Sequence, residues 1–162
     1  LGPVMDSMRA ASILKNLRTL HIRMKKHSEN AQYLSEKFFN DDITVIYPGL
    51  KHHPQNSLMS QLMNKEFGYG GMLVIDMNTK EKANQLMEEM QANNLGYLAV
   101  SLGFYKTLFS APSHSTSSEI PENNRKNIGL SDGLVRISIG LDNDIKRTYK
   151  LMKNCIDKVN SF

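Results

Sequence analysis

The sequence predicts a single α+β domain over residues 1–162, with helices on one face of a largely antiparallel sheet. Apolar residues recur every three or four positions in the longer segments, as in helices that bury one stripe. In the shorter segments apolar residues occupy every second position, and the positions between them are polar or also apolar, as in strands. The segments follow one another without the regular spacing of strand–helix–strand units, which argues against a parallel sheet.

A long leading helix is expected over residues 1–40, with its regular part from about Asp6 to Phe39. His27 occupies one position of its apolar stripe. No second His, Cys or carboxylate stands at metal-ligand spacing from His27, so we expect a half-buried histidine with satisfied hydrogen bonds. The other positions of the stripe are Ile13, Leu17, Leu20, Met24, Ala31, Leu34 and Phe38.

The middle of the chain is expected to alternate between strands and helices. Asn78, followed by Glu81 three residues later, has the signature of a helix N-terminus. The expected elements are a strand over 43–47, a short helix through 58–63, a strand over 72–77 and a helix from the Asn78 cap to residues 93–96.

The last third of the chain contains a hydroxyl-rich segment. Residues 110–118 include five serines and a threonine, which cannot form a core, so we expect either a flexible linker or a ligand-facing loop. The elements expected around this segment are a strand over 97–102, an extended stretch over 107–109, a short helix over 121–129, a strand over 134–139 and a helix over 145–159.

One arginine stands out in the strand predicted over 134–139. Alternation places Val135, Ile137 and Ile139 on one face of this strand, and Arg136 with Ser138 on the other. The apolar face is expected to pack against helices, so the guanidinium points to the far side of the sheet. A cation in that position is either paired within the protein or available to an anion.

Charge and composition exclude several other classes of function. The net charge of +4 permits nucleic-acid binding without requiring it. Because the basic residues of the first helix lack an accompanying nucleic-acid motif, we expect no nucleic-acid partner. No apolar run approaches the length of a membrane span and no leader opens the chain, so we expect a soluble, cytoplasmic protein. The histidines lack partners at metal-ligand spacing, so we expect no metal site. Cys155 is expected to serve packing. Because the chain opens on Leu1, we expect it to be part of a longer protein.

Two motifs, Leu98-Ala99-Val100-Ser101-Leu102-Gly103 and the run from Ser131 to Asp142, carry a resemblance to a known family. With residues 17–24 and 47–54 they occur in order and with compatible spacing over nearly the whole chain. The chain resembles the carboxy-terminal domain of the pyridoxal-phosphate enzymes of cysteine and methionine metabolism. This family includes methionine γ-lyases, cystathionine γ-lyases and γ-synthases, and O-acetylhomoserine sulfhydrylases, and methionine γ-lyases are the most similar.

The resemblance implies a fold-type I small domain and a set of substrate-binding residues. Arg136 is expected to grip the α-carboxylate of an amino-acid substrate, with Ser101 beside it, because a guanidinium matches the planar geometry of a carboxylate. Thr116 matches a threonine that reaches toward the substrate side chain, although the surrounding residues depart from the usual family pattern. Val100 stands where many cystathionine enzymes have a glutamate, and an apolar residue suits a thioether.

The expected function is therefore γ-elimination of methionine or a related sulfur amino acid, which cleaves the Cγ–S bond and gives a thiol, a 2-oxo acid and ammonia. In the family, pyridoxal phosphate forms a Schiff base with a lysine in a Ser-x-Thr-Lys setting. That setting does not occur in this chain, where Thr79-Lys80 lies at a helix start. We therefore expect no catalytic or cofactor-binding residues in this chain and no activity of the chain alone, and the resemblance implies that full-length proteins are homo-oligomers.

Other functions remain open. The upstream enzyme could be an O-acetylhomoserine sulfhydrylase or a cystathionine γ-synthase or γ-lyase, since by alternation Val100 faces away from Ser101 and its effect on the pocket depends on local twist. A non-catalytic module that binds a small ligand is also compatible with an α+β sheet that leaves one face open.

Overall fold

The computed structural model describes residues 4–114, 120–121, 124 and 131–161, and it has the predicted α+β architecture. The short helix predicted over 121–129 lies almost entirely outside the described residues. The described elements are α1 (Ser7–Leu17), α2 (Leu20–Asn40), β1 (Val45–Ile46), α3 (Asn56–Leu62), β2 (Met72–Asp76), α4 (Lys80–Ala92), β3 (Tyr97–Leu98), β4 (Leu108–Ser110), the 3₁₀ turn η1 (Pro112–His114), β5 (Leu134–Ser138) and α6 (Ile145–Asn160).

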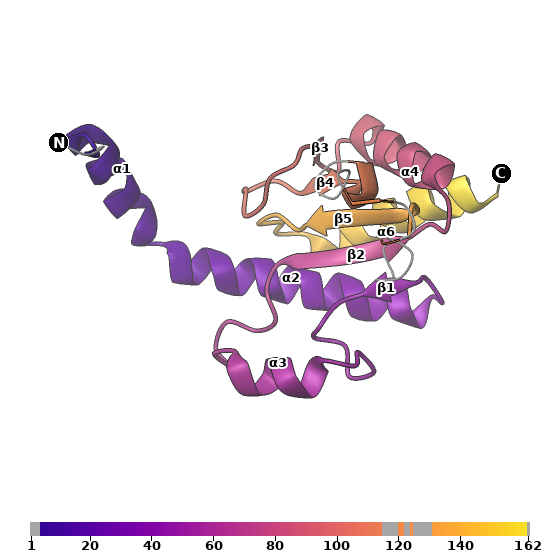
Figure 1. The fold of residues 1–162 in the computed structure, drawn as a ribbon, viewed down its shortest axis with the longest axis horizontal. Coiled ribbons are helices and arrows are strands. Elements are labelled where there is room, and N and C mark those ends of the chain that lie inside the picture. The colour runs from indigo at the N-terminus through magenta and orange to yellow at the C-terminus, as the bar shows by residue number, and fades with distance from the viewer. Residues whose placement is uncertain (1–3, 115–119, 122–123, 125–130, 162) are drawn as a thin grey trace.

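The five strands form one sheet in the order β1-β2-β5-β4-β3, and only β3 and β4 run parallel (Figure 1). The sheet is therefore largely antiparallel, as predicted. β5 is its central strand and pairs antiparallel with β2 on one side and β4 on the other. The strand that carries Arg136 is thus fixed by hydrogen bonds along both of its edges.

The core lies between one face of the sheet and the helices α2, α4 and α6. In the sheet, direct cross-strand partners share a face, so Ile75 lies beside Val135, and Ile137 lies between Leu73 and Phe109. All five side chains are buried. The helices contribute buried apolar residues at helical spacing, which are Ala31, Leu34 and Phe38 of α2, Ala83, Leu86, Met87 and Met90 of α4, and Met152, Cys155, Ile156 and Val159 of α6.

The prediction of one continuous leading helix over 1–40 was wrong. The helix is interrupted at Arg18 and Thr19, which separate α1 from α2. The break frees the carbonyl of Asn16, which accepts a hydrogen bond of 2.8 Å from Nη2 of Arg23. Nε of the same guanidinium donates to the Thr19 hydroxyl. The apolar stripe continues in phase across this joint, so periodicity alone does not reveal the kink. No residue of α1 is buried, and α1 projects away from the sheet (Figure 1).

The strand predicted over 97–102 ends at Leu98, because its continuation turns across the sheet. Ala99 still donates its backbone N–H to Phe109 O. Beyond it, Ser101 O and Gly103 N bond to side chains of β5 rather than to a strand ladder. The predicted two-faced alternation of this segment is therefore lost, and both Val100 and Leu102 are exposed.

His27 is more deeply buried than predicted, with only 3% of its surface exposed. Its Nδ1 lies 2.6 Å from Ile139 O, and because a carbonyl only accepts, Nδ1 is the donor. Nε2 has no hydrogen-bond partner within the described part of the chain, so the prediction that all hydrogen bonds of His27 are satisfied was wrong for this nitrogen.

Cys155 is buried in the core, and its burial raises the pKa of the thiol, as expected of a packing residue. None of the described helices is both long and apolar enough to cross a membrane.

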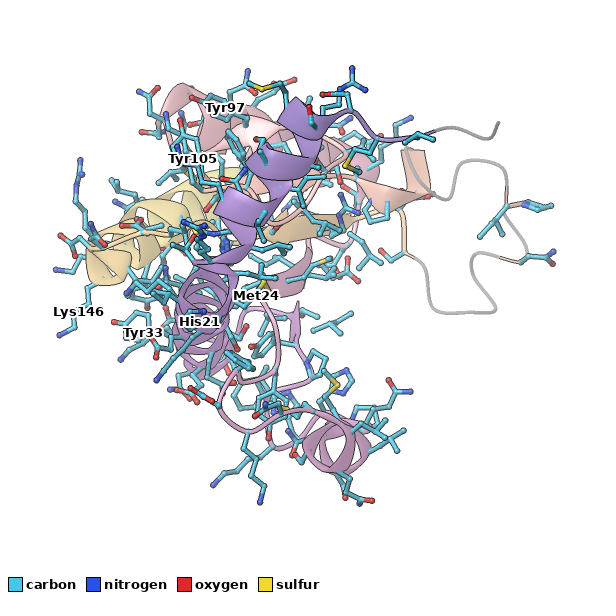
Figure 2. The ribbon with its side chains drawn as sticks, turned by 90° about the vertical axis from the view of Figure 1, so that its left-hand side faces the viewer. His21, Met24, Tyr33, Tyr97, Tyr105 and Lys146 are labelled. Atoms are coloured by element: carbon cyan, nitrogen blue, oxygen red, sulfur yellow. The ribbon has the colours of Figure 1, made fainter. Side chains whose placement is uncertain are left out.

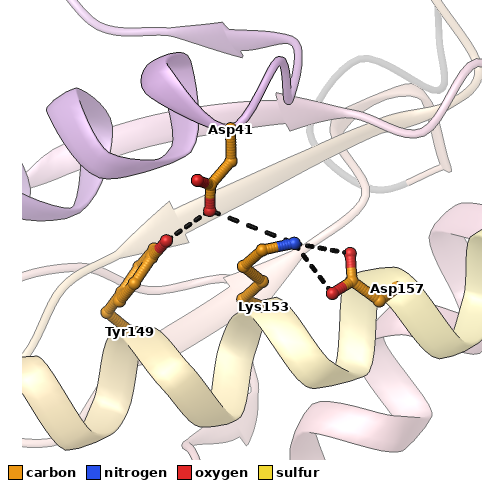
Figure 3. Close-up of polar contacts among 4 residues, drawn as sticks. All are labelled: Asp41, Tyr149, Lys153 and Asp157. Atoms are coloured by element: carbon orange, nitrogen blue, oxygen red, sulfur yellow. Dashed lines mark hydrogen bonds and ion pairs between the residues drawn. The ribbon is translucent and has the colours of Figure 1, made fainter.

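A polar cluster joins the end of α2 to α6 (Figure 3). The hydroxyl of Tyr149 donates to Oδ2 of Asp41 at the C-cap of α2. Nζ of Lys153 lies 4.0 Å from the same carboxylate oxygen and 2.8 Å from Asp157 one helical turn further along α6. The hydrogen bond to Asp41 and burial raise the pKa of Tyr149 to about 12.

Replacing Tyr149 by Phe is expected to lower the free energy of unfolding by about 1 kcal/mol, because the ring stays and only the hydrogen bond to a carboxylate is lost. Urea denaturation measures this difference. Tyr33→Phe is the matched control, since Tyr33 packs edge-on against Tyr149 and its hydroxyl makes no hydrogen bond within the described residues. An equal loss in both variants would contradict the assignment.

The stability difference between wild type and Tyr149→Phe is expected to depend on pH. The raised pKa of Tyr149 means that the folded state keeps its phenol proton after the unfolded state has lost it. The stability difference between wild type and Tyr149→Phe is thus constant below the ordinary tyrosine pKa of about 10 and disappears as the pH rises toward the folded-state value. Denaturation curves across this range check the prediction, and a difference that grows with pH would refute it.

Candidate functional site

The face of the sheet opposite the core carries a row of side chains centred on Arg136. Val74 of β2 and Ser110 of β4 are its direct cross-strand partners, and Ile46 of β1 follows Val74. Val135 and Ile137, on either side of Arg136 in β5, are fully buried in the core. The alternation predicted for this strand is therefore confirmed, and it holds Arg136 on the far face.

Within the described residues, the guanidinium of Arg136 has spare hydrogen-bonding capacity. Its Nη2 donates to Ser101 O over 3.2 Å. No carboxylate among the described residues forms an ion pair with Arg136, whereas a guanidinium carries five N–H donors in a planar fork. A half-buried cation with unused donors is suited to bind an anion, and a planar carboxylate fits the fork best.

The segment over 99–106 forms a loop that crosses the sheet beside this arginine. It leaves from the edge strand β3, and its Gly103 N donates to Ser138 Oγ of the central strand β5 over 3.1 Å. At its far end, Tyr105 O accepts from Leu141 N. A Cβ at Gly140 would lie 2.6 Å from Tyr105 O, so only glycine permits this close approach of loop and strand.

The loop presents apolar and aromatic side chains to the surface. Val100, Leu102, Phe104 and Tyr105 are all exposed, and the rings of Phe104 and Tyr105 lie 4.4 Å apart. Figure 2 labels Tyr97, which lies on β3 just before the loop begins, and Tyr105 near the other end of the loop. Nζ of Lys106 donates to the Tyr97 hydroxyl over 2.7 Å and ties these ends together.

The structure brings together two of the four residues that the sequence suggested for substrate binding. Arg136 and Ser101 are in contact, through the carbonyl oxygen of Ser101 rather than its hydroxyl. Val100 is adjacent in sequence and 60% exposed. Thr116 lies outside the described residues.

The structure also brings Ser110 to this site, and sequence reasoning did not single it out. Ser110 is only 4% exposed and stands directly opposite Arg136. The alternation of Leu108, Phe109 and Ser110 contains part of the signal, because an inward Phe109 requires an outward Ser110. The pairing of this strand with β5 requires the structure.

Other surface features offer less defined chemistry. A cavity of about 540 Å³ lies between the start of α2 and the loops around residues 66–67 and 141–143, and neither Arg136 nor Ser101 lines it. His21 and Lys25 face this cavity together with Glu29 and Glu66, so its charges are mixed. The described residues hold no cluster of His, Cys, Asp or Glu that could bind a metal ion.

Comparison with known proteins finds relatives of this chain in sequence and in structure. The profile of the Cys/Met metabolism PLP-dependent enzymes matches residues 1–148. Methionine γ-lyase of Arabidopsis thaliana is 45% identical over 141 residues, which are 86% of this chain and 32% of that protein. The crystal structure of cystathionine γ-lyase from yeast superposes with a TM-score of 0.81 and 29% identity, over 90% of this chain and 37% of that chain.

A putative O-acetylhomoserine (thiol)-lyase from Campylobacter jejuni superposes with a TM-score of 0.79 at 31% identity, covering 89% of this chain and 34% of that one. That crystal structure contains a pyridoxyl-lysine phosphate residue. The chain thus spans about a third of the length of these relatives and has the fold of one part of the fold-type I enzymes. Together the profile match, the relatives and the fold show that the chain belongs to the family of Cys/Met metabolism PLP-dependent enzymes.

Proposed function

We propose that this chain is the substrate-carboxylate-binding part of a carbon–sulfur lyase. The full-length protein cleaves the Cγ–S bond of methionine or a related sulfur amino acid and releases a thiol, a 2-oxo acid and ammonia. The observation that carries this proposal is the Arg136 guanidinium, which lies on the far face of the central strand beside Ser101 O and has unused donors among the described residues.

The physical role of Arg136 follows from the geometry of its side chain. Two parallel N–H···O hydrogen bonds to a carboxylate fix both the position and the orientation of the ligand. Since the α-carbon is bonded to that carboxylate, gripping it also positions the α-carbon for reaction. The rigid central strand supports this role, because β2 and β4 hold β5 from both sides.

The preference for methionine rests on Val100 and on the relatives. An exposed apolar residue beside Ser101 favours a thioether over the ammonium end of cystathionine. The Arabidopsis relative at 45% identity is named a methionine γ-lyase. Cystathionine is the second candidate substrate, because a Dictyostelium discoideum relative named cystathionine γ-lyase is 34% identical over 98% of this chain.

The described residues do not fit the attachment of pyridoxal phosphate. A lysine that forms a Schiff base must lose its proton, and burial is the usual way to lower its pKa. No lysine among the described residues is buried. Hydrogen bonds to Tyr97 and Asp157 raise the pKa values of Lys106 and Lys153, which is the opposite direction. We therefore propose that a part of the protein outside this chain binds the cofactor.

We also infer that the full-length protein is a homo-oligomer, as its resemblance to the family implies. α1 supports an apolar contact beyond this chain, because none of its residues is buried. Met8, Ile13, Leu14 and Leu17 of this helix are large apolar side chains exposed to solvent.

In the full-length protein, Arg136→Ala is expected to raise the KM for L-methionine about 100-fold, because a charge-assisted bidentate contact is lost. Arg147→Ala provides the matched control, since Arg147 is an exposed arginine at the start of α6 and should leave KM unchanged. Steady-state kinetics measures both. An unchanged KM in Arg136→Ala would end the proposed carboxylate role.

Val100→Glu is expected to shift substrate preference. A carboxylate at this position should favour the distal ammonium of cystathionine and disfavour a thioether, changing the ratio of the two kcat/KM values about tenfold in favour of cystathionine. Val100→Leu, which stays apolar, serves as the control. If Glu and Leu give the same ratio, residue 100 does not select the substrate.

Pyridoxal phosphate added to this chain is expected to give no Schiff-base absorbance that survives dialysis, because none of the described lysines has the buried setting that usually activates a Schiff-base lysine. A stable absorbance band would show that the chain carries the cofactor lysine after all.

Calorimetry of the same chain with L-methionine tests the alternative of a non-catalytic ligand-binding module. Tight binding without cofactor would favour that module over part of a lyase.

A further inference from the structure

We propose that Ser110 is a further ligand-binding residue, whose hydroxyl donates a hydrogen bond to the carboxylate that Arg136 binds. This inference rests on the proposed function, because it requires Arg136 to hold a carboxylate. The hydrogen bond from Ser110 on β4 adds to the contact that Arg136 on β5 makes with the same carboxylate.

The register of the sheet places the two residues together. Ser110 is the direct partner of Arg136 in the antiparallel pair of β4 and β5. Direct partners share a face, and their Cβ atoms lie about 4.5–5.5 Å apart. The preceding pair, Phe109 and Ile137, points into the core, so Ser110 and Arg136 both point to the far face.

The loop over 99–106 contacts the face of the sheet that carries Ser110. It starts beyond the end of β3 and reaches Ser138 on β5, so it crosses the face of β4 that carries Ser110. Arg136 binds Ser101 O of the same loop. The loop therefore contacts the same face of the sheet as Ser110, which is only 4% exposed.

The hydroxyl of Ser110 has no hydrogen-bond partner within the described part of the chain. A buried hydroxyl without a partner is costly, and most buried polar groups are paired. The neighbouring hydroxyl on the same face is paired, since Ser138 Oγ accepts from Gly103 N. Among the described residues of this face, Arg136 therefore has unused donors and Ser110 has an unpartnered hydroxyl.

An unpartnered hydroxyl alone identifies no site, and Ser35 shows this. Ser35 is also buried with an unpartnered Oγ, but it lies on α2 among the buried residues of the helix layer. What distinguishes Ser110 is the cation opposite it. A guanidinium only donates hydrogen bonds, so toward Arg136 the serine oxygen can only accept, and its O–H proton remains for an anion. A carboxylate is the ligand that both groups can bind at once.

The test uses the full-length protein, calorimetry and two probes. L-Norleucine has the chain length of methionine without the sulfur leaving group, and L-norleucinamide lacks the carboxylate charge. Ser110→Ala is expected to raise the Kd for norleucine about tenfold and to change the Kd for norleucinamide less than about twofold. Ser110→Thr, which keeps the hydroxyl, should bind norleucine within about threefold of wild type.

Two further variants keep the test decisive. Ser35→Ala removes the same atoms from a buried serine away from the site and should bind both probes like wild type. If Ser110→Ala does not fold, as shown by circular dichroism, Ser110→Cys preserves the side-chain volume with a weaker donor and should show the same selective loss for norleucine.

The outcomes separate this inference from the proposed function. If Arg136→Ala weakens norleucine binding selectively and the Ser110 variants do not, Arg136 holds the carboxylate alone and the role of Ser110 is overturned. If Arg136→Ala leaves norleucine binding unchanged, the proposed function itself fails. Equal weakening of both probes in Ser110→Ala would indicate a packing role and would also overturn the inference.

Discussion

The alternation of β5 is the constraint on which the rest of the structure depends. Val135 and Ile137 are fully buried against the helices, and Ile139 continues this buried row beyond the strand. Fully burying one such side chain stabilises the fold by about 1.5–3 kcal/mol, so a one-residue slip that turned this face outward would be strongly disfavoured. The same constraint holds Arg136 on the opposite face. The packing of the core therefore also fixes the position of Arg136, the candidate ligand-binding cation.

Polar side chains of α2 secure the end of this strand. His27 bonds to Ile139 O, and Asn30 donates through its Nδ2 to Gly140 O and Asp142 O. Both side chains are buried, so these contacts are shielded from water. The long helix thus contributes an apolar stripe to the core and also holds the turn that leads from β5 to α6. Above the sheet, the bonds from the loop over 99–106 to Arg136 and Ser138 attach the candidate site to the same strand.

Much of this arrangement follows from sequence patterns, and the exceptions have physical causes. Arg136 and its apolar neighbours could be placed because alternation in a strand is a local property. The break at Thr19 could not, since the apolar stripe stays in phase across it. The early end of β3 was also missed, because Ser101 and Gly103 exchange ladder bonds for contacts with β5, which is distant in sequence. Ser110 was hidden for the same reason, as register between strands is a tertiary property.

The central claim is that Arg136 binds the carboxylate of an amino acid. It is tested most directly by a crystal structure of the full-length protein with L-norleucine. The account predicts two guanidinium nitrogens of Arg136 at about 2.7–2.9 Å from the two carboxylate oxygens. A well-ordered norleucine whose carboxylate lies elsewhere, with Arg136 still bonded only to Ser101 O, would contradict it.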